Sequence, residues 1–385
     1  SYTGAVTPAK VQAESSNGIK VDTTYTPEIV PVTPTAIPAE TTDIQGATQT
    51  SKPKFKGGTV TVDGVEKTVE INEDVPATFD DGSTTKTVEG VGTYTVAADG
   101  TVTFVPEKSF VGTAPAVTVV REDKNGTKAS ATYTPTVLPV TPTATPAETT
   151  DIQGATQKGK PEFKGGTVTV DGVEKTVEIN EDVPATFDDG STTKTVEGVG
   201  TYTVAADGTV TFVPEKSFVG TAPAVTVVRE DKNGTKASAT YTPTVTAVTP
   251  TATPAETSGV QGATQSGKPT FTEGDSRVPM NDDVPATFDD GSTTKTVEGV
   301  GTYTVAADGT VTFVPDPSFT GTAPAVTVVR EDKNGSKASA TYTPTVNPVT
   351  LTPTNKVSED IQNVPQTETP TFALSDDETA QITSK

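Results

Sequence analysis

Short stretches in which polar and apolar residues alternate run along the whole chain, and turn-forming dipeptides separate them. Alternation with a period of two places successive side chains on opposite faces of a strand, so each stretch predicts a half-buried β-strand. Asp63-Gly64 and Asn125-Gly126 favour tight hairpin turns. Three hairpins are predicted in the first third of the chain: residues 59–62 with 67–71, residues 94–96 with 102–104, and residues 116–121 with 128–137.

The balance of residue types also favours strands over helices. Thr and Val dominate, whereas Leu occurs only at Leu138, Leu351 and Leu374. Leu is a good helix former, while the β-branched residues suit strands. We therefore expect an all-β protein, built as a tandem array of immunoglobulin-like or cadherin-like β-sandwich modules joined by Pro/Thr-rich linkers.

The tandem array follows from internal repetition. Residues 55–137 and 163–245 are the same string, displaced by 108 positions. A third copy at 283–346 differs from the second only at Asp316, Pro317, Thr320 and Ser336. A fixed long period is the signature of a modular array. The third copy also lacks seven residues of the hairpin around Asp63-Gly64, so this hairpin is predicted to be peripheral, with the core sandwich between residues 75 and 137.

The repetition predicts where domains begin and end. The Pro/Thr/Ala-rich linkers are expected to be extended polyproline segments that space neighbouring modules apart, giving a rod. The chain is expected to begin inside one repeat and to end inside another. The expected parts are the end of a preceding repeat at 1–30, repeats at 43–137, 151–245 and 259–346, the start of a following repeat at 357–385, and linkers at 31–42, 138–150, 246–258 and 347–356.

Composition excludes several classes of function. The chain has no Cys and no His, which removes disulfides, thiolate nucleophiles, imidazole bases and the usual zinc ligands. With 28 basic and 50 acidic residues, its net charge of −22 argues against nucleic acid and anionic membranes as partners. No apolar run is long enough to span a bilayer. We expect no enzymatic activity and no bound organic cofactor.

Longer motifs carry a family resemblance over essentially the whole chain. They are residues 91–96, 99–106, 109–119, 131–137 and 152–157. In these motifs the chain resembles the CshA-type fibril repeats of streptococcal cell-wall-anchored surface adhesins. The resemblance implies an extracellular location on a Gram-positive cell surface, a role in adhesion and virulence, and an anchor and export signal outside this sequence. It also implies that host matrix proteins or bacterial surface proteins bind mainly outside these repeats.

Three functions remain open at this point. The first is a monomeric, rod-like stalk that projects an adhesive region away from the cell wall. The second is direct binding of a host protein by exposed sheet edges, with near-identical copies supplying avidity. The third is a cadherin-like array stiffened by Ca²⁺ at its joints.

Acidic pairs are the candidates for a calcium site, because Ca²⁺ takes six to eight oxygen ligands. The same residues also suit ordinary solvated turns, and no Asp-x-Asp-x-Asp ladder accompanies them. The candidates are Glu73, Asp74, Asp80, Asp81, Glu122 and Asp123. An intramolecular Lys–Asn isopeptide bond is a second hypothesis, with Lys52, Lys86, Lys124 or Lys128 and Asn72 or Asn125 as the possible partners.

Overall fold

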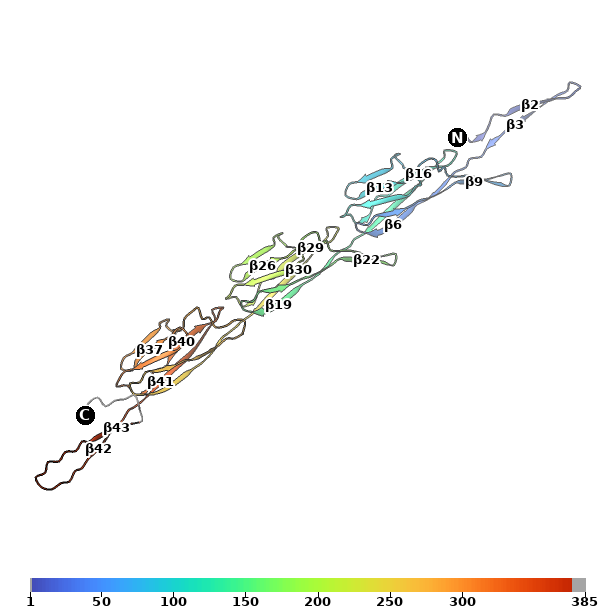
Figure 1. Cartoon of the computed structure of the whole chain (residues 1–385). Helices are drawn as coiled ribbons and strands as arrows, with labels where there is room; N and C mark the ends of the chain where they lie inside the picture. Colours follow the sequence, from blue (N-terminus) through green and yellow to red (C-terminus); the bar gives the residue numbers. More distant parts are fainter. Residues whose placement is uncertain (1, 376–385) are drawn as a thin grey trace.

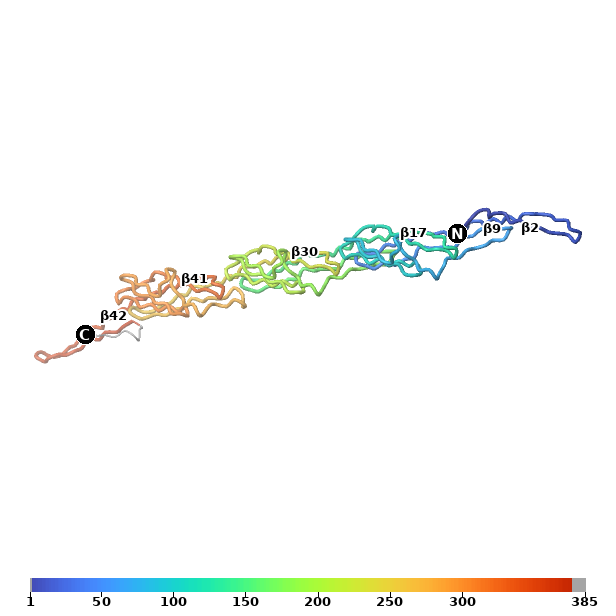
Figure 2. The backbone as a smooth tube through the Cα atoms, turned by 90° about the horizontal axis from the view of Figure 1, so that it is seen from above, coloured from blue at the N-terminus to red at the C-terminus, as the bar shows by residue number. Residues whose placement is uncertain are grey.

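The chain forms a row of β-sandwiches that lie end to end, as a computed structural model shows (Figure 1). The structure describes residues 2–375, and this part contains strands and no helix. A view turned by 90° gives the same elongated outline, with β2 (Ala9–Glu14) and β42 (Leu351–Thr354) toward opposite ends (Figure 2). The predicted all-β class and tandem sandwich arrangement are therefore confirmed.

The larger sheet of the first repeat is organised around one long strand. β17 (Lys128–Leu138) pairs antiparallel with β16 (Val117–Glu122) and then with β15 (Gly112–Thr113). Its other edge pairs in parallel with β6 (Ala39–Ile44), and β11 (Thr78–Phe79) completes the sheet beside β16. The β16–β17 hairpin turns at Asn125-Gly126, as its sequence predicts.

The smaller sheet packs against the larger one and has four strands. Tyr94 lies opposite Phe104, in the register expected for the second predicted hairpin. Two further strand pairs lie outside these sheets, and one of them turns at Asp63-Gly64 as predicted. The sheet order is β12 (Thr85–Val88), β13 (Gly92–Val96), β14 (Val102–Pro106) and β7 (Gln49–Ser51), and the extra pairs are β9 (Gly58–Val62) with β10 (Val65–Val69) and β5 (Thr35–Ile37) with β8 (Lys54–Lys56).

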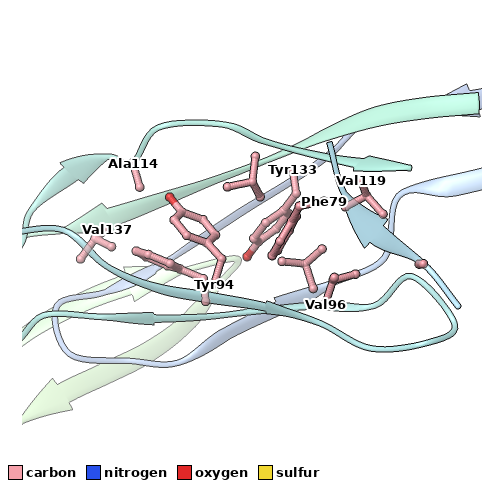
Figure 3. Close-up of a cluster of buried hydrophobic side chains, with 11 residues drawn as sticks. Phe79, Tyr94, Val96, Ala114, Val119, Tyr133 and Val137 are labelled. Carbon is pink, nitrogen blue, oxygen red and sulfur yellow. The ribbon is translucent and has the colours of Figure 1, made fainter. Parts of the chain in front are cut away.

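Aromatic residues fill the space between the two sheets (Figure 3). The rings of Tyr94 and Phe104 are 4.6 Å apart between centroids, a tilted arrangement that adds to the burial energy. The hydroxyl of Tyr94 donates to the carbonyl of Pro115 at 2.8 Å, so its one polar atom is satisfied. Phe79 and Tyr133 complete the set of large buried side chains. These four aromatic residues are thus core residues, and Phe55 and Phe110 are partly buried against them.

The second and third repeats reproduce this plan. Their cores consist of the equivalent residues, with the same tilted pairs at Tyr202–Phe212 and Tyr303–Phe313. The strands of the second repeat are β18 (Thr143–Thr145), β19 (Ala147–Ile152), β20 (Gln157–Gly159), β21 (Glu162–Lys164), β22 (Gly166–Val170), β23 (Val173–Val177), β24 (Thr186–Phe187), β25 (Thr193–Val196), β26 (Gly200–Val204), β27 (Val210–Pro214), β28 (Gly220–Thr221), β29 (Val225–Glu230) and β30 (Lys236–Thr246).

The third repeat lacks the counterparts of β22 and β23. An isolated bridge between Asp275 and Val278 takes their place. Its strands are β31 (Thr251–Thr253), β32 (Ala255–Val260), β33 (Gln265–Gly267), β34 (Thr270–Thr272), β35 (Thr287–Phe288), β36 (Thr294–Val297), β37 (Gly301–Val305), β38 (Val311–Pro315), β39 (Gly321–Thr322), β40 (Val326–Glu331) and β41 (Lys337–Asn347).

The end segments keep the pairing of a repeat. β2 (Ala9–Glu14) and β3 (Lys20–Tyr25) pair in the register of β16 and β17, and β1 (Gly4–Ala5) pairs with β4 (Glu28–Ile29) as β15 does with β17. At the other end, β42 (Leu351–Thr354) pairs with β43 (Thr371–Leu374) in the manner of β31 with β34. Residues 376–385, the last part of the segment predicted to start a following repeat, lie outside the described residues.

The Pro/Thr/Ala-rich segments differ from the extended polyproline conformation expected of them. Within 138–150, β18 pairs with β21, and β19 pairs in parallel with β30. Pro142 and Pro146 lie just outside these strands, so the Thr and Ala residues between them keep their N–H groups for pairing. The sandwich also extends beyond residues 75–137, because Ala39 and Phe55 pack against its core. The predicted boundaries of the repeats and linkers stay a prediction.

Truncating a core ring should destabilise the repeat that contains it. Phe212 is fully buried, and Phe212→Ala should lower the free energy of unfolding of the second repeat by about 3–5 kcal/mol, since it removes apolar contacts and leaves a cavity. Val213, its half-exposed neighbour on the opposite face, is the control, and Val213→Ala should change this free energy by less than about 0.5 kcal/mol. Urea denaturation of the whole chain, followed by far-UV circular dichroism, measures both; equal effects would contradict the core assignment.

Candidate functional site at the joint between modules

The connection between the first and second repeats is short and is held by hydrogen bonds. β17 ends at Leu138 and β18 begins at Thr143. The backbone N–H of Gln45 donates to the carbonyl of Leu138 at 2.9 Å. The buried N–H of Val140 donates to the side-chain oxygen of Gln45 at 3.4 Å. One residue of the first repeat therefore fixes the chain on both sides of Pro139.

An apolar cluster seals this joint. The β22–β23 hairpin of the second repeat projects back toward the first repeat (Figure 1), and its Val170 and Val177 are buried. They pack with Ile44 of the first repeat and Val140 of the connection. Burial of such side chains is worth on the order of 1.5–3 kcal/mol each. The hairpin thus ties one module to the next.

Two polar contacts cross the same joint. The ammonium group of Lys175, in β23, lies 2.6 Å from both carboxylate oxygens of Asp43, whose side chain is only 16% exposed. The side-chain amide of Asn233 donates to the backbone carbonyl of Gln45 at 2.8 Å. Both contacts join residues more than a hundred positions apart, so they fix how the two modules lie relative to each other.

A buried carboxylate positions Asn233. One oxygen of Asp231 accepts the backbone N–H groups of Asn233 and Thr235, both at 2.9 Å. Gly234 has a φ of +85°, which the turn requires and which glycine adopts without strain. Asp231 is fully buried. This turn presents the Asn233 amide to the first repeat.

Gly46 leaves the room that Asn233 occupies. A Cβ atom at Gly46 would lie 2.3 Å from the side-chain oxygen of Asn233, which is far inside van der Waals contact. The equivalent Gly154 would meet Asn334 in the same way at 2.5 Å. At Gly262 no atom lies within 4 Å of such a Cβ. A glycine at this position is thus needed for close approach only where a module docks.

The joint between the second and third repeats keeps the amide contact and changes the ion pair. The amide of Asn334 donates to the carbonyl of Gln153 at 2.8 Å. Arg277, from the segment that replaces the lost hairpin, donates to the carboxylate of Asp151 at 2.8 Å. Together with the N–H of Ile152, this guanidinium lowers the pKa of Asp151. Asp151 occupies the position equivalent to Asp43. The segment that replaces the hairpin is shorter, and it reaches this carboxylate with an arginine side chain in place of a lysine.

The first repeat shows the hairpin without a docked neighbour. Lys67, the counterpart of Lys175, is exposed and forms no ion pair among residues 2–375. Val62 and Val69 are only half-buried, whereas their counterparts Val170 and Val177 are buried. Because these stretches have the same sequence, the difference comes from the neighbouring module alone.

Three of the calcium candidates, Glu73, Asp80 and Asp81, form ion pairs with basic side chains. Arg121 donates to Glu73 at 3.0 Å and lowers the pKa of that carboxylate. Lys86 pairs with both Asp80 and Asp81. No three acidic side chains come together as a metal site within the described part of the chain. A calcium site stays a prediction.

The remaining candidates have structural surroundings of their own. Asp123 is fully buried and accepts the backbone N–H groups of Asn125 and Thr127, as Asp231 does in the second repeat. Asp74 is exposed and Glu122 is half-buried. Of the lysines considered for an isopeptide bond, Lys52 pairs with Asp99 at 3.0 Å.

Sequence reasoning missed the joint residues. The β9–β10 hairpin is peripheral to its own sandwich, as predicted, but its counterpart β22–β23 docks on the preceding module. A signal was present in the sequence: the hairpin alternates Val on one face although its own module does not need these residues for a core. A second signal of the joint was Arg277, which appears in the third repeat where the hairpin is lost.

Adding a methyl group at the joint should open it. Gly46→Ala forces Asn233 away from Gln45, whereas Gly262→Ala, with nearly the same φ, meets nothing. Both variants pay the same backbone strain, about 1 kcal/mol, so their difference isolates the docking contact. We expect hydrogen exchange of the amides at 44–47 to accelerate in Gly46→Ala, with no comparable change at 260–263 in Gly262→Ala. Similar behaviour of the two variants would show that the joint is not closely packed in solution.

Acid should weaken the modules through their paired carboxylates. The N–H of Thr101 and the ammonium group of Lys52 lower the pKa of Asp99 to about 2. A carboxylate with a lowered folded-state pKa stabilises the fold above its unfolded value near 4, and this contribution is lost as the pH falls through about 4 toward 2. We expect the melting temperature of the chain to fall over this range, and Asp99→Asn to reduce the slope. A melting temperature independent of pH would contradict this.

Comparison with known proteins places the sequence. The family model described as "Surface adhesin CshA repetitive domain" matches residues 31–137, 139–245 and 247–346. No curated protein matches the sequence. Each matched segment begins at or near the Pro/Thr/Ala-rich stretch, which agrees with the strands found there.

Several solved structures of tandem domains are similar to the chain. Mouse cadherin-23 EC22-24 shares 13% identity over 83% of this chain and 100% of its own, with a TM-score of 0.31. A tandem segment of titin shares 10% identity over 82% of this chain and 97% of its own, with a TM-score of 0.30. Protocadherin gamma B2 cadherin domains 1-5 share 9% identity over 90% and 73%, with a TM-score of 0.33.

Scores this low carry no argument about function, so membership rests on the family match. That match covers three consecutive repeats between residues 31 and 346, well over half of the chain, in agreement with the repeated sandwiches and their joints. The chain belongs to the family of surface adhesin CshA repetitive domains.

Proposed function

We propose that the chain is a structural stalk of a bacterial surface fibril, which projects an adhesive region away from the cell wall. The observation that carries this proposal is the joint between modules, where three kinds of contact recur at both complete joints. They are the hydrogen bonds of Gln45 or Gln153 to the connection, a side-chain amide contact and an ion pair. Together these contacts restrain both bending and rotation, which a stalk needs in order to transmit a position over a distance.

The net negative charge supports a rod that stays monomeric. The net charge of −22 makes copies repel one another, and it also favours separation of modules along one chain. Salt weakens this repulsion, because the screening length is only about 8 Å at physiological ionic strength. The apolar cluster at the first joint and the amide hydrogen bonds at both joints do not depend on charge repulsion, so we infer that the stalk stays extended in salt.

The adhesive and anchoring parts are a further element of the proposal. Within the described residues no helix is long and apolar enough to cross a membrane. We propose attachment to the cell wall through a segment outside this sequence, and contact with host or bacterial surface proteins through another. Enzymatic activity forms no part of the proposal.

Small-angle scattering tests the rod directly. A module whose longest strand has 11 residues spans roughly 36 Å at about 3.3 Å per residue. Three modules in line should therefore exceed about 100 Å, with a radius of gyration well above the roughly 21 Å expected of a globule of this length. We expect this at both low and high salt. A compact particle, or collapse in salt, would contradict the stalk.

A binding measurement separates the stalk from the alternative in which the repeats themselves capture a host protein. The whole chain is immobilised, and soluble fibronectin and collagen are passed over it at physiological salt. A stalk should bind neither. Tight binding by the whole chain that weakens as repeats are removed would favour the alternative, since avidity depends on the number of copies.

A further inference from the structure

The same Asn-Gly dipeptide occurs in every repeat, and two of its copies lie in joints. It occurs at Asn125-Gly126, Asn233-Gly234 and Asn334-Gly335, and also at Asn17-Gly18 in the first end segment. Asn is among the residues that limit the chemical lifetime of proteins. A following glycine makes it the most reactive, since its missing side chain lets the backbone nitrogen approach.

The reaction is an internal substitution followed by hydrolysis. The backbone nitrogen of the glycine attacks the Cγ carbon of the asparagine, the new C–N bond closes a succinimide ring, and the Cγ–Nδ2 bond breaks. Nδ2 leaves as ammonia with the proton that the glycine nitrogen loses. Water then opens the ring at either carbonyl, giving aspartate or isoaspartate. No oxidant or reductant is needed, and water is the only co-reactant.

Local structure is the same at the first two sites. The N–H of Gly126 donates to the carbonyl of Asp123 at 2.9 Å, and that of Gly234 donates to Asp231 at 2.9 Å. The buried aspartate accepts the same backbone N–H groups in both turns. The sequence of both turns is also identical. Intrinsic reactivity is therefore matched.

Docking is what distinguishes the sites. Asn125 is exposed, and its side chain has no hydrogen-bond partner among residues 2–375. Asn233 is half-buried, and its Nδ2 is held by the carbonyl of Gln45 at 2.8 Å. Asn334 is held by Gln153 in the same way. The side chain must rotate toward its own glycine nitrogen to react, so a docked joint restrains the reacting group.

We propose that Asn233 and Asn334 are deamidation sites, protected while their joint is closed, and that deamidation prevents the joint from closing again. The product replaces a donor amide with a carboxylate oxygen, which then faces the Gln45 carbonyl, so two acceptors oppose each other. The isoaspartate product also lengthens the backbone of the turn. A joint that opens often is thereby converted, without any enzyme, into one that stays flexible. This inference rests on the joint and not on the stalk function.

One molecule contains its own standard for the test. The whole chain is incubated at 37 °C near neutral pH and then cut by a protease specific for Glu. Cleavage after Glu122 and Glu148 releases residues 123–148, and cleavage after Glu230 and Glu256 releases 231–256. These peptides differ in mass because Leu138-Pro139 is replaced by Thr246-Ala247, so each site is measured separately.

Asn125 should deamidate about fivefold faster than Asn233. A net hydrogen-bond free energy of about 1 kcal/mol lowers the population of freely rotating Asn233 side chains by about this factor. In Gly46→Ala, whose joint is blocked, the rate at Asn233 should rise to that at Asn125. Equal rates at the two sites in the unmodified chain would overturn the proposal, as would a rate at Asn233 that Gly46→Ala does not change.

A matched pair of variants tests the consequence. Asn233→Asp places the product at the joint, and Asn125→Asp places it in the same turn without a neighbour. Hydrogen exchange of the peptide that contains Gln45 and Gly46 should accelerate in Asn233→Asp and stay unchanged in Asn125→Asp. Because both turns have one sequence, a shared loss of folding would show in both variants. Unchanged exchange in Asn233→Asp would show that the modified joint still closes, contrary to the proposal.

Discussion

The hydrogen bond from an Asn-Gly turn to the backbone of the preceding module is the contact on which the arrangement of this chain depends. It requires a buried aspartate to shape the turn and a glycine opposite to admit the side chain. Around it, an ion pair and, at the first joint, an apolar cluster complete the docking surface. Since the acceptor is a backbone carbonyl, the contact depends on the path of the chain more than on the acceptor's side chain. This explains how it survives where the ion pair changes.

The two joints show how a module can lose a hairpin and keep its place in the row. In the second repeat, Lys175 reaches Asp43 from a strand of the hairpin. In the third repeat, Arg277 reaches Asp151 from a short segment, while Asp275 holds its guanidinium. The long guanidinium side chain covers the distance that the missing strands leave. Val248 of the connection is buried at the second joint, as Val140 is at the first. The ion pair is more exposed than at the first joint, since the Arg277 side chain is 56% exposed.

Aromatic packing stabilises each module in the absence of disulfides. The six fully buried Tyr side chains of the three repeats each have a hydrogen-bond partner for their hydroxyl group. Burying these rings therefore leaves no tyrosine hydroxyl unsatisfied. The outer faces carry Thr–Thr pairs and solvated carboxylates that pair with lysines. A core this self-contained lets the joint vary between neighbours without loss of the sandwich.

The sequence by itself determined the strands, the hairpin turns and the repeat, because alternation and Asn-Gly or Asp-Gly turns are local signals. Strand alternation also decides which face a side chain occupies, as the buried Tyr94 and Phe104 on paired strands show. Only the tertiary structure decided that the Pro/Thr/Ala-rich segments pair as strands, and that Lys175, Asn233 and Gly46 form a joint. The contacts of the joint link residues more than a hundred positions apart. Identical sequences in the first two repeats behave differently there, because what differs is the neighbour and not the local chain.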